Sequence, residues 1–284
     1  MKHAYLIITH NEFEVLSKLL QALDDERNDI YIHFDRKVKQ LPLLQTKHAT
    51  LYILEDRVDV RWGHVSQIKA EYALFEATHK KAKYQRYHLI SGTHLPLYSQ
   101  NYIHRFFNEL QHQEVLACMP TSDYEIDLKL QRYNFFMRNF AHPNLFIKSL
   151  NQWLWRLGIG IQRKLHIRRN KNRPYKKAAN WASITGDCVA FLLSRKKEVL
   201  KKYRYTMCGD EFFVPSELEV SSEEWNVMCC DRLIKTDMKR ANARSYLMED
   251  YEDLINSRCL FSRKFSQEDM EVVDKIMNHI ETMK

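Results

Sequence analysis

The hydrophobic pattern of the first 37 residues predicts a strand, a helix and a second strand. Residues 5–9 are almost wholly apolar, as a buried parallel strand requires. From residue 12 the apolar positions follow helical spacing after a suitable N-cap at Asn11, and residues 30–34 form a second apolar run. Ligands of open α/β sheets bind beyond the carboxyl ends of the strands. We therefore expect one nucleotide-binding rim, shared by residues at the ends of both runs: Thr9, His10, Asn11 and Asp35.

The same alternation continues to about residue 120. Short apolar runs are separated by segments with helical spacing, in the order 51–54, 66–75, 87–90, 101–110 and 115–119. A turn-rich loop, residues 91–97, follows the third of these runs. This order is typical of an α/β fold with a mostly parallel central sheet flanked by helices.

Residues 128–177 differ because they combine helical spacing, aromatic side chains and positive charge. Between Asp127 and Asp187 the chain has 13 Lys or Arg residues and no acidic residue, whereas the remainder has 31 basic and 36 acidic residues. A helix of this kind could lie on an anionic bilayer surface, and a core-packing helix with a solvated basic tail explains the pattern equally well. Its predicted apolar face contains Phe146, Ile147, Leu150, Trp153, Leu154, Leu157 and Ile161.

Length and composition favour one α/β domain covering residues 1–284, with a nucleotide-binding half (1–120) and an acceptor and catalytic half (121–284). No apolar run approaches the ~20 residues that a membrane span requires, and the N-terminal run is too short for a signal peptide. The six cysteines form no Cys-x-x-Cys pair, so we expect reduced thiols and a cytoplasmic protein, at most peripheral on the inner membrane face. No nucleic-acid partner is expected, because no module signature accompanies the basic segment.

Several stretches together resemble the core-2/I-branching family of glycosyltransferases, which also contains the peptide xylosyltransferases. The order and spacing of these stretches, rather than any single motif, carry a resemblance that covers most of the chain. It implies a GT-A-like fold, a UDP-sugar donor, inversion at the anomeric carbon and, unusually for GT-A enzymes, no metal ion. The stretches are residues 4–11, 32–37, Arg61-Trp62-Gly63 with Ser66, 91–97, 209–213 and 260–265.

Glu211 is the candidate catalytic base. Inverting transfer requires a carboxylate that takes the proton of the acceptor hydroxyl, together with positive charge for the departing diphosphate. Glu211 lies between a Gly-Asp turn and an aromatic pair, where partial desolvation would raise its pKa. The resemblance places the family's catalytic carboxylate at this residue, with Asp210 beside it. A carboxylate at a helix N-terminus is the alternative explanation.

The leaving diphosphate needs cationic side chains, and Lys264 with Arg263 are the leading candidates. The resemblance implies that Lys264 contacts the diphosphate and that a basic residue about twenty positions earlier does likewise. Lys239 and Arg240 occupy that interval, and a solvated surface loop is the alternative for this pair.

The acidic residues do not form the Asp-x-Asp pattern of metal-dependent GT-A enzymes. Asp35 is followed by Arg36 and Lys37, which are unsuitable neighbours for a metal ion. The cluster Asp123, Glu125 and Asp127 is better explained as a solvated loop or helix start than as a metal site.

The nucleotide itself would contact the backbone around residues 9–11 and the side chain of Asp35, which can accept the uracil and ribose donors. Arg61 and Trp62 are predicted to line the same cleft, although packing beneath a loop explains Trp62 equally well. His94 stands where the family usually has Asp, which removes a fixed negative charge and leaves the donor-sugar or acceptor contacts there open.

These observations predict an inverting, metal-independent glycosyltransferase. We expect it to move N-acetylglucosamine from its UDP conjugate to a hydroxyl of a glycan or lipid-linked oligosaccharide in surface polysaccharide or glycolipid synthesis, like a β-1,6-N-acetylglucosaminyltransferase. UDP-xylose, UDP-glucose and UDP-galactose are alternative donors. A non-catalytic protein that binds RNA or anionic lipid is the alternative from another class. The absence of Gly-x-Ser-x-Gly, P-loop and Gly-x-Gly-x-x-Gly motifs argues against hydrolases, NTPases and dinucleotide enzymes.

Overall fold

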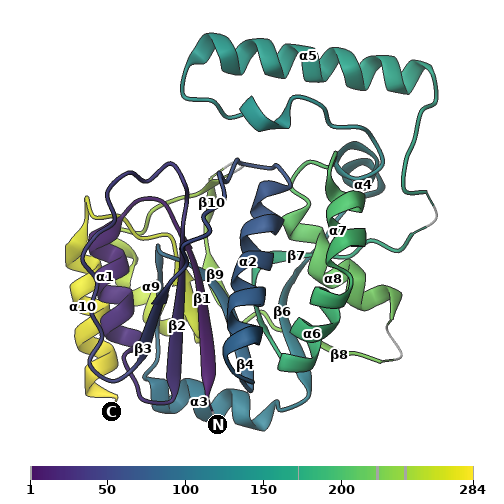
Figure 1. Ribbon diagram of the computed structural model, residues 1–284. Helices are drawn as coiled ribbons and strands as arrows, with labels where there is room; N and C mark the ends of the chain where they lie inside the picture. The colour runs from purple at the N-terminus through teal and green to yellow at the C-terminus, as the bar shows by residue number, and fades with distance from the viewer. Residues whose placement is uncertain (1, 172, 222–223, 240–241, 284) are drawn as a thin grey trace.

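A central sheet of seven strands, in the order β3-β2-β1-β4-β7-β6-β8, organises the computed structural model, which describes residues 2–171, 173–221, 224–239 and 242–283 (Figure 1). β7 runs antiparallel to β4 and β6, whereas the other pairs are parallel. The predicted α/β fold class with a mostly parallel sheet is confirmed. The strands are β1 (His3–Thr9), β2 (Asn28–Phe34), β3 (Thr50–Ile53), β4 (Arg86–Ser91), β6 (Gln113–Met119), β7 (Lys177–Ile184) and β8 (Asn226–Cys229).

Helices cover both faces of the sheet, which explains why the strands are apolar throughout rather than alternating. On β1, Tyr5 and Ile7 belong to one buried cluster, and Leu6 and Ile8 belong to the other. The first cluster is completed by α1 (Phe13–Leu23), α3 (Gln100–Glu109), α9 (Tyr251–Asn256) and α10 (Met270–Thr282). The second is completed by α2 (Ser66–Lys81), α6 (Gly186–Ser194), α7 (Lys196–Tyr203) and α8 (Asp210–Val220).

A small three-stranded sheet brings the C-terminal segment to the carboxyl end of β4. It contains β5 (His94–Pro96), β12 (Phe261–Arg263) and β9 (Ile234–Thr236), with β12 in the centre. Part of the predicted loop 91–97 is therefore a strand, because its backbone groups pair with a segment more than 160 residues away. The remaining short elements are the hairpin β10 (Met238–Lys239) and β11 (Asn242–Ala243) and the 3-10 helix η2 (Met248–Asp250).

A helical arm follows β6 and contains α4 (Asp123–Lys129), the 3-10 helix η1 (Met137–Asn139) and α5 (Leu145–Lys164). Figure 1 shows α5 lying apart from the sheet, beyond the end of the strands opposite the N-terminus. The predicted helical character of residues 128–177 is confirmed for α5, but the segment also contains extended chain and the first residue of β7. In the ranges that the structure describes, no helix is long and apolar enough to cross a membrane.

The N-cap predicted at Asn11 is wrong, because Glu12 occupies the cap position of α1 with a left-handed backbone (φ 56°). The Glu12 carboxylate accepts hydrogen bonds from Ser266 Oγ (3.1 Å) and from the backbone N–H of Gln267 (2.6 Å). These contacts join the start of α1 to the segment that follows β12. A partner so distant in sequence could not be seen from local capping patterns.

The expectation of reduced thiols is also wrong for one pair, since Cys118 and Cys229 form a disulfide. They lie on β6 and β8, which are parallel neighbours, and their Cα atoms are 5.2 Å apart. Their separation of 111 residues concealed this proximity in the sequence. The other four cysteines are free and buried. Because one pair is oxidised, the cysteines no longer support the predicted cytoplasmic location.

Candidate functional site

The predicted site residues gather at the rim formed by the carboxyl ends of β1, β2, β4 and β6, the end of the sheet on which α5 lies in Figure 1. β1 ends at Thr9, β2 at Phe34 and β4 at Ser91, so three neighbouring strands deliver their following loops to one edge. Gly92 lies so close to Thr9 that a Cβ atom there would clash with the Thr9 Oγ1 and Cβ atoms. The sequence thus requires glycine where the loops after β1 and β4 meet.

Four charged residues, Asp35, Lys37, Asp59 and Arg61, form what we call the Asp59 cluster. Lys37 Nζ lies 2.5 Å from Asp35 Oδ2 and 3.2 Å from Asp59 Oδ1, and Arg61 Nη2 donates to Asp59 Oδ2 (2.9 Å). Desolvation acts to raise the pKa of Asp59, but hydrogen bonds from Arg61 and Lys37 outweigh it and lower the pKa to about 2. The backbone N–H of Asp35 donates to Thr9 O (2.9 Å), which fixes the cluster to the end of β1.

Asp35 and Arg61 are therefore placed at the rim as predicted, but both are engaged with neighbouring charges. Asp35 is 4% exposed, and its second oxygen accepts from the Lys37 backbone N–H (2.9 Å). A carboxylate has about four acceptor positions, so Asp35 keeps capacity for a further donor.

His10 lies within electrostatic reach of Lys264 and of this cluster. The pKa of His10 is lowered by desolvation and by the positive charges of Lys37 and Lys264, against the opposing charge of Asp35. Lys264 is held by its backbone oxygen, which accepts from the N–H of Tyr246 (2.8 Å). Residues from the first strand and from the C-terminal segment thus come within electrostatic reach of each other, as the predicted diphosphate site requires.

Arg263 lies over an aromatic ring at the same rim. Its guanidinium carbon is 5.0 Å from the centre of the Trp181 ring, and its Nε is buried with no hydrogen-bond partner in the described chain. Burial lowers the pKa of Arg263 to about 10. The His94 ring also packs against Trp181 in an edge-to-face arrangement, with the two ring centres 4.9 Å apart.

His94 is fully buried and orders the turn after β4. Its Nδ1 accepts from the backbone N–H of Ser91 (3.0 Å) and lies 2.8 Å from Ser91 Oγ. Burial and the nearby charge of Arg263 lower the pKa of His94 well below its usual value, so the ring is neutral. Where the resemblance implies Asp, this chain therefore has a neutral histidine whose ring accepts a hydrogen bond from the backbone of the turn.

A second group of charges, Glu125, Lys129, Lys177 and Glu211, forms what we call the Glu211 cluster. Lys129 Nζ lies 3.3 Å and Lys177 Nζ 3.5 Å from Glu211 Oε2, and the same ammonium groups lie 2.7 and 2.8 Å from Glu125 Oε1. Both ammonium groups also lie over the Phe212 ring, at 5.8 and 5.9 Å. The Glu211 side chain is 29% exposed and stands in the first turn of α8.

Near Asp210, the neighbour of Glu211, lie buried polar side chains with atoms that have no hydrogen-bond partner among the described residues. Glu71, on α2, is fully buried, and neither of its carboxyl oxygens has a hydrogen-bond partner within the described part of the chain; the same is true of Asp210 Oδ1 and of the Asn180 side-chain amide. Desolvation and the charge of Glu211 raise the pKa of Asp210 to about 7. Desolvation and the charge of Asp210 raise the pKa of Glu71 well above its usual value, and the Asn180 side chain acts in the opposite direction.

Sequence reasoning missed Glu71, Lys129 and Lys177. In the sequence, the two lysines are recognisable only as members of the basic segment. Nothing local in the sequence indicates that α4 and β7 converge on α8. Glu71 had a detectable signal, because it stands among the apolar positions Ile68 and Tyr72 on the buried side of its helix. A carboxyl group there is unusual unless it is paired or protonated.

The loop that contains Arg61-Trp62-Gly63 connects the two clusters. The Cys208 backbone N–H, just before α8, donates to Gly63 O (2.9 Å). The Trp62 ring stacks on Phe140 at 5.9 Å, and Trp62 is 37% exposed. Trp62 is thus packed on the helical arm on one side and open on the other.

Lys239 and Arg240 are the predicted second pair of phosphate-binding cations, and the structure describes only the first of them. Lys239 is exposed at the end of β10, and Arg240 lies outside the described residues. Arg244, which follows β11, forms ion pairs with Asp237 (2.9 Å) and Asp250 (2.6 Å). Lys239 is therefore the residue of the predicted pair that the structure can place.

The three acidic residues of α4 have different surroundings. Asp123 begins the helix, Glu125 belongs to the Glu211 cluster, and Asp127 pairs with Arg132 and Arg168 (both 2.9 Å). The helix-start interpretation is confirmed, but Glu125 and Asp127 are paired rather than simply solvated. Among the residues with described positions, no three or more His, Cys, Asp or Glu residues are grouped as metal ligands would be.

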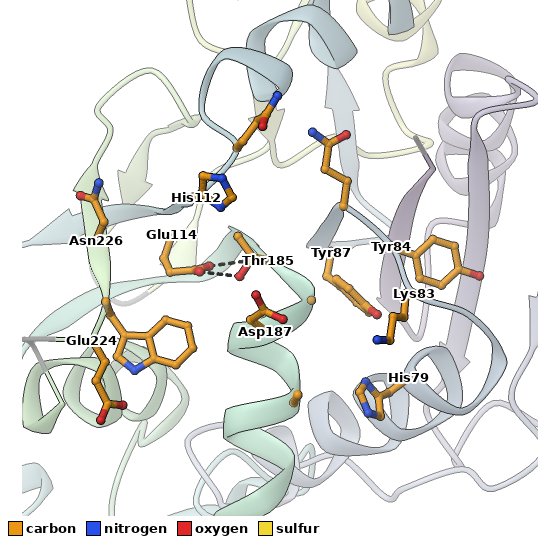
Figure 2. A pocket seen from close by; sticks show the side chains of 15 residues that line it. His79, Lys83, Tyr84, Tyr87, His112, Glu114, Thr185, Asp187, Glu224 and Asn226 are labelled. Carbon is orange, nitrogen blue, oxygen red and sulfur yellow. Dashed lines mark hydrogen bonds between the residues drawn. The ribbon is translucent and has the colours of Figure 1, made fainter.

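A cavity of about 590 Å³ lies at the opposite end of the sheet, near the N-termini of β4, β6 and α6 (Figure 2). Figure 2 shows Glu114 accepting hydrogen bonds from Thr185, at 2.7 Å from the backbone N–H and 2.5 Å from Oγ1. No predicted site residue lines this cavity. Because α/β sheets bind ligands at the carboxyl ends of their strands, we place the candidate site at the rim instead.

A family model described as Core-2/I-Branching enzyme matches residues 3–251. No curated protein sequence matches the chain. Among solved structures, mouse xyloside xylosyltransferase 1 in its apo form is 10% identical with a TM-score of 0.39, covering 92% of this chain and 96% of that one. S. aureus TarS 1-349 is 12% identical with a TM-score of 0.29, covering 49% of this chain and 44% of that one.

Proposed function

The chain belongs to the core-2/I-branching enzyme family of glycosyltransferases, and we propose that it transfers N-acetylglucosamine, with inversion and without a metal ion, from its UDP conjugate to a glycan hydroxyl. The observation that carries this proposal is the position of Glu211. It is a partly exposed carboxylate at the ligand-binding rim, next to two lysines and above buried carboxyl groups.

Glu211 acts as the general base. One of its oxygens takes the proton of the acceptor hydroxyl while the hydroxyl oxygen attacks the anomeric carbon. The bond between that carbon and the diphosphate oxygen breaks at the same time, and the bonding electrons leave with UDP. Lys129 and Lys177 support this role because they orient the carboxylate, and the Phe212 ring beneath them fixes their position.

Lys264 stabilises the negative charge of the departing diphosphate, with Lys239, Arg240 and Arg263 as further members of the cationic set. Support comes from the proximity of Lys264 to His10 and to the end of β1, where the nucleotide is expected. A charge-assisted hydrogen bond to phosphate strengthens as the leaving group gains charge, which is the requirement for transition-state stabilisation. Arg263 contributes its charge at greater distance, since its guanidinium group lies over Trp181.

Metal independence is supported by the chemistry of the Asp59 cluster. The position that would carry a metal-binding Asp-x-Asp pattern is occupied by Asp35, and its carboxylate is paired with the ammonium group of Lys37. A divalent ion at Asp35 would have to displace that cation. Side-chain cations therefore take the part that a metal ion has in metal-dependent GT-A enzymes.

The donor sugar and the acceptor are tested by a donor panel. The purified chain is incubated in turn with UDP-N-acetylglucosamine, UDP-xylose, UDP-glucose and UDP-galactose, with glycan and lipid-linked oligosaccharide acceptors, and release of UDP is measured. We expect the highest kcat/KM with UDP-N-acetylglucosamine. A higher value with another donor would replace the sugar in the proposal, and no turnover with any donor, together with no UDP binding, would remove the enzymatic proposal.

A further inference from the structure

The outward face of α5 is a row of large, exposed apolar side chains. Phe146 is 76% exposed and Trp153 is 57% exposed, and the other members of the row are exposed by more than 40%. They recur every three or four residues and therefore lie on one side of the helix. We call these residues the α5 face: Phe146, Leu150, Trp153, Leu157 and Ile161.

The opposite side of α5 fixes the helix to the protein. Trp155 Nε1 donates to Asn134 Oδ1 (2.7 Å), and buried Gln162 accepts at Oε1 from the Tyr133 backbone N–H (2.7 Å). The Phe140 ring lies between Trp155 and the rim residue Trp62, at 5.3 and 5.9 Å. The α5 face is thus presented outward by a helix with a defined orientation. Covering this apolar surface would remove it from water.

Positive charge borders the α5 face along one flank and at one end. The four cations of α5 are Lys148, Arg156, Arg163 and Lys164, and none forms an ion pair among residues 2–171, 173–221, 224–239 and 242–283. At about 100° per residue, Arg156 and Arg163 fall on one flank of the apolar row, and Lys164 stands at its end. The chain has no acidic residue between Asp127 and Asp187. The occupant of this face must therefore be apolar within and anionic at its surface.

We propose that α5 docks in the plane of an anionic phospholipid bilayer, with the α5 face at the boundary between headgroups and acyl chains and with the flanking cations on the lipid phosphates. A second copy of the chain would bring two cation-rich surfaces together, which is unfavourable. RNA would satisfy the cations but would leave the aliphatic members of the row uncovered. Only the bilayer matches both the apolar row and its charged border.

The placement of α5 gives this docking a consequence for the rim. Figure 1 shows α5 on the side of the sheet at which the strands carry their C-terminal loops. A chain docked through α5 holds its rim close to the lipid surface, where a lipid-linked acceptor would present its sugar. The docking itself does not depend on sugar transfer, so its test does not require activity.

The test is flotation of the full chain with phosphatidylcholine vesicles that contain either no anionic lipid or about 30 mol% phosphatidylglycerol. We expect flotation with the anionic vesicles only, and a decrease when the ionic strength rises from about 0.1 M to about 1 M. The double substitution Trp153→Ser with Leu157→Ser should reduce partitioning about tenfold or more. The matched control Leu43→Ser removes a leucine that is 90% exposed on a loop outside α5, and it should float like the wild type.

A charge pair completes the test. Arg156→Glu with Arg163→Glu should weaken flotation and flatten its salt dependence, whereas Lys80→Glu, at the other end of the molecule on α2, should not. All substituted side chains are exposed, so unchanged thermal unfolding excludes loss of fold as the cause. Three results would overturn the proposal: a wild-type chain that does not float on anionic vesicles, a dimer that the Trp153→Ser and Leu157→Ser substitutions dissociate, or random-RNA binding that they abolish.

Discussion

The Asp59 cluster and the Glu211 cluster contain the same kinds of side chain at the same rim, and in both of them each acid is paired with a cation; they differ in the buried carboxyl groups that lie beside them. In the Asp59 cluster each acid is paired with a cation, and the pKa of Asp59 falls to about 2. Under the Glu211 cluster, Asp210 and Glu71 are buried with oxygens that have no partner in the described chain, and the pKa of Asp210 rises to about 7.

The two halves of the rim therefore differ in pKa, and the carboxyl groups beside Glu211 are those whose protonation can change near neutral pH. The pKa of about 2 keeps Asp59 ionised over the whole physiological range, so the Asp59 cluster is suited to positioning. Burial and the charge of Glu211 raise the pKa of Asp210 to about 7 against the opposing charge of Lys129, so the surroundings of Glu211 respond to pH near neutrality. Groups with perturbed pKa values are common in catalytic sites. We therefore expect proton transfer on the Glu211 side of the rim.

The largest expected effect comes from Glu211→Gln, which removes the base but keeps the shape of the side chain. We expect transfer to fall about 10³-fold or more, within the range of general-base catalysis and its supporting geometry. The matched control is Glu125→Gln, because Glu125 contacts the same two lysines without being the base. Equal losses in both variants, measured as kcat/KM for the donor, would erase the distinction between the two acids.

Lys264→Ala tests the cationic side of the rim. Loss of a charge-assisted hydrogen bond of about 1.5–3 kcal/mol should lower kcat/KM for the donor by about 10- to 100-fold. Lys264→Arg should retain part of the activity because it preserves the charge. Lys39→Ala removes an exposed lysine from the loop after β2 and should have little effect. An unchanged kcat/KM in Lys264→Ala would remove this residue from the diphosphate site.

Asp59→Asn measures the stability that pairing supplies. The folded pKa of Asp59 lies below its unfolded value of 3.8, so its stabilisation is present above pH 3.8 and is lost as the pH falls through about 2. We expect the free energy of unfolding in urea to drop by about 2 kcal/mol at pH 7 and by much less near pH 2. Asp56→Asn, an exposed acid on the same loop, should change it by less than about 0.5 kcal/mol. Equal losses at both pH values would contradict the account.

Glu71→Gln should change stability in the opposite direction, by an amount that grows with pH. Because burial raises the folded pKa of Glu71, the wild type loses stability as the pH rises above the unfolded value of 4.5. The variant should therefore gain relative stability between pH 5 and pH 8, by at most about 1.4 kcal/mol per pH unit. Glu76→Gln, on the same helix but paired with Lys196, is the control. A difference between variant and wild type that does not change with pH would show that Glu71 is not a buried acid.

Local patterns predicted the fold more completely than the site. The apolar run of β1 and the helical spacing of α1 depend on neighbouring residues, so both elements appear where the sequence predicts them. The three-stranded sheet and the Cys118–Cys229 disulfide depend on partners more than 100 residues away and could not be read locally. Glu211 was predicted from its flanking residues, but Lys129 and Lys177 reach it only after α4, β7 and α8 have packed.

We propose that UDP binds at the rim through side-chain cations, separately from the base. The most direct test is a calorimetric titration of UDP into the wild type and into Glu211→Gln, with excess EDTA present. The account predicts binding in EDTA with the same Kd for both proteins. Binding that appears only after manganese is added, or that is lost in Glu211→Gln, would contradict it.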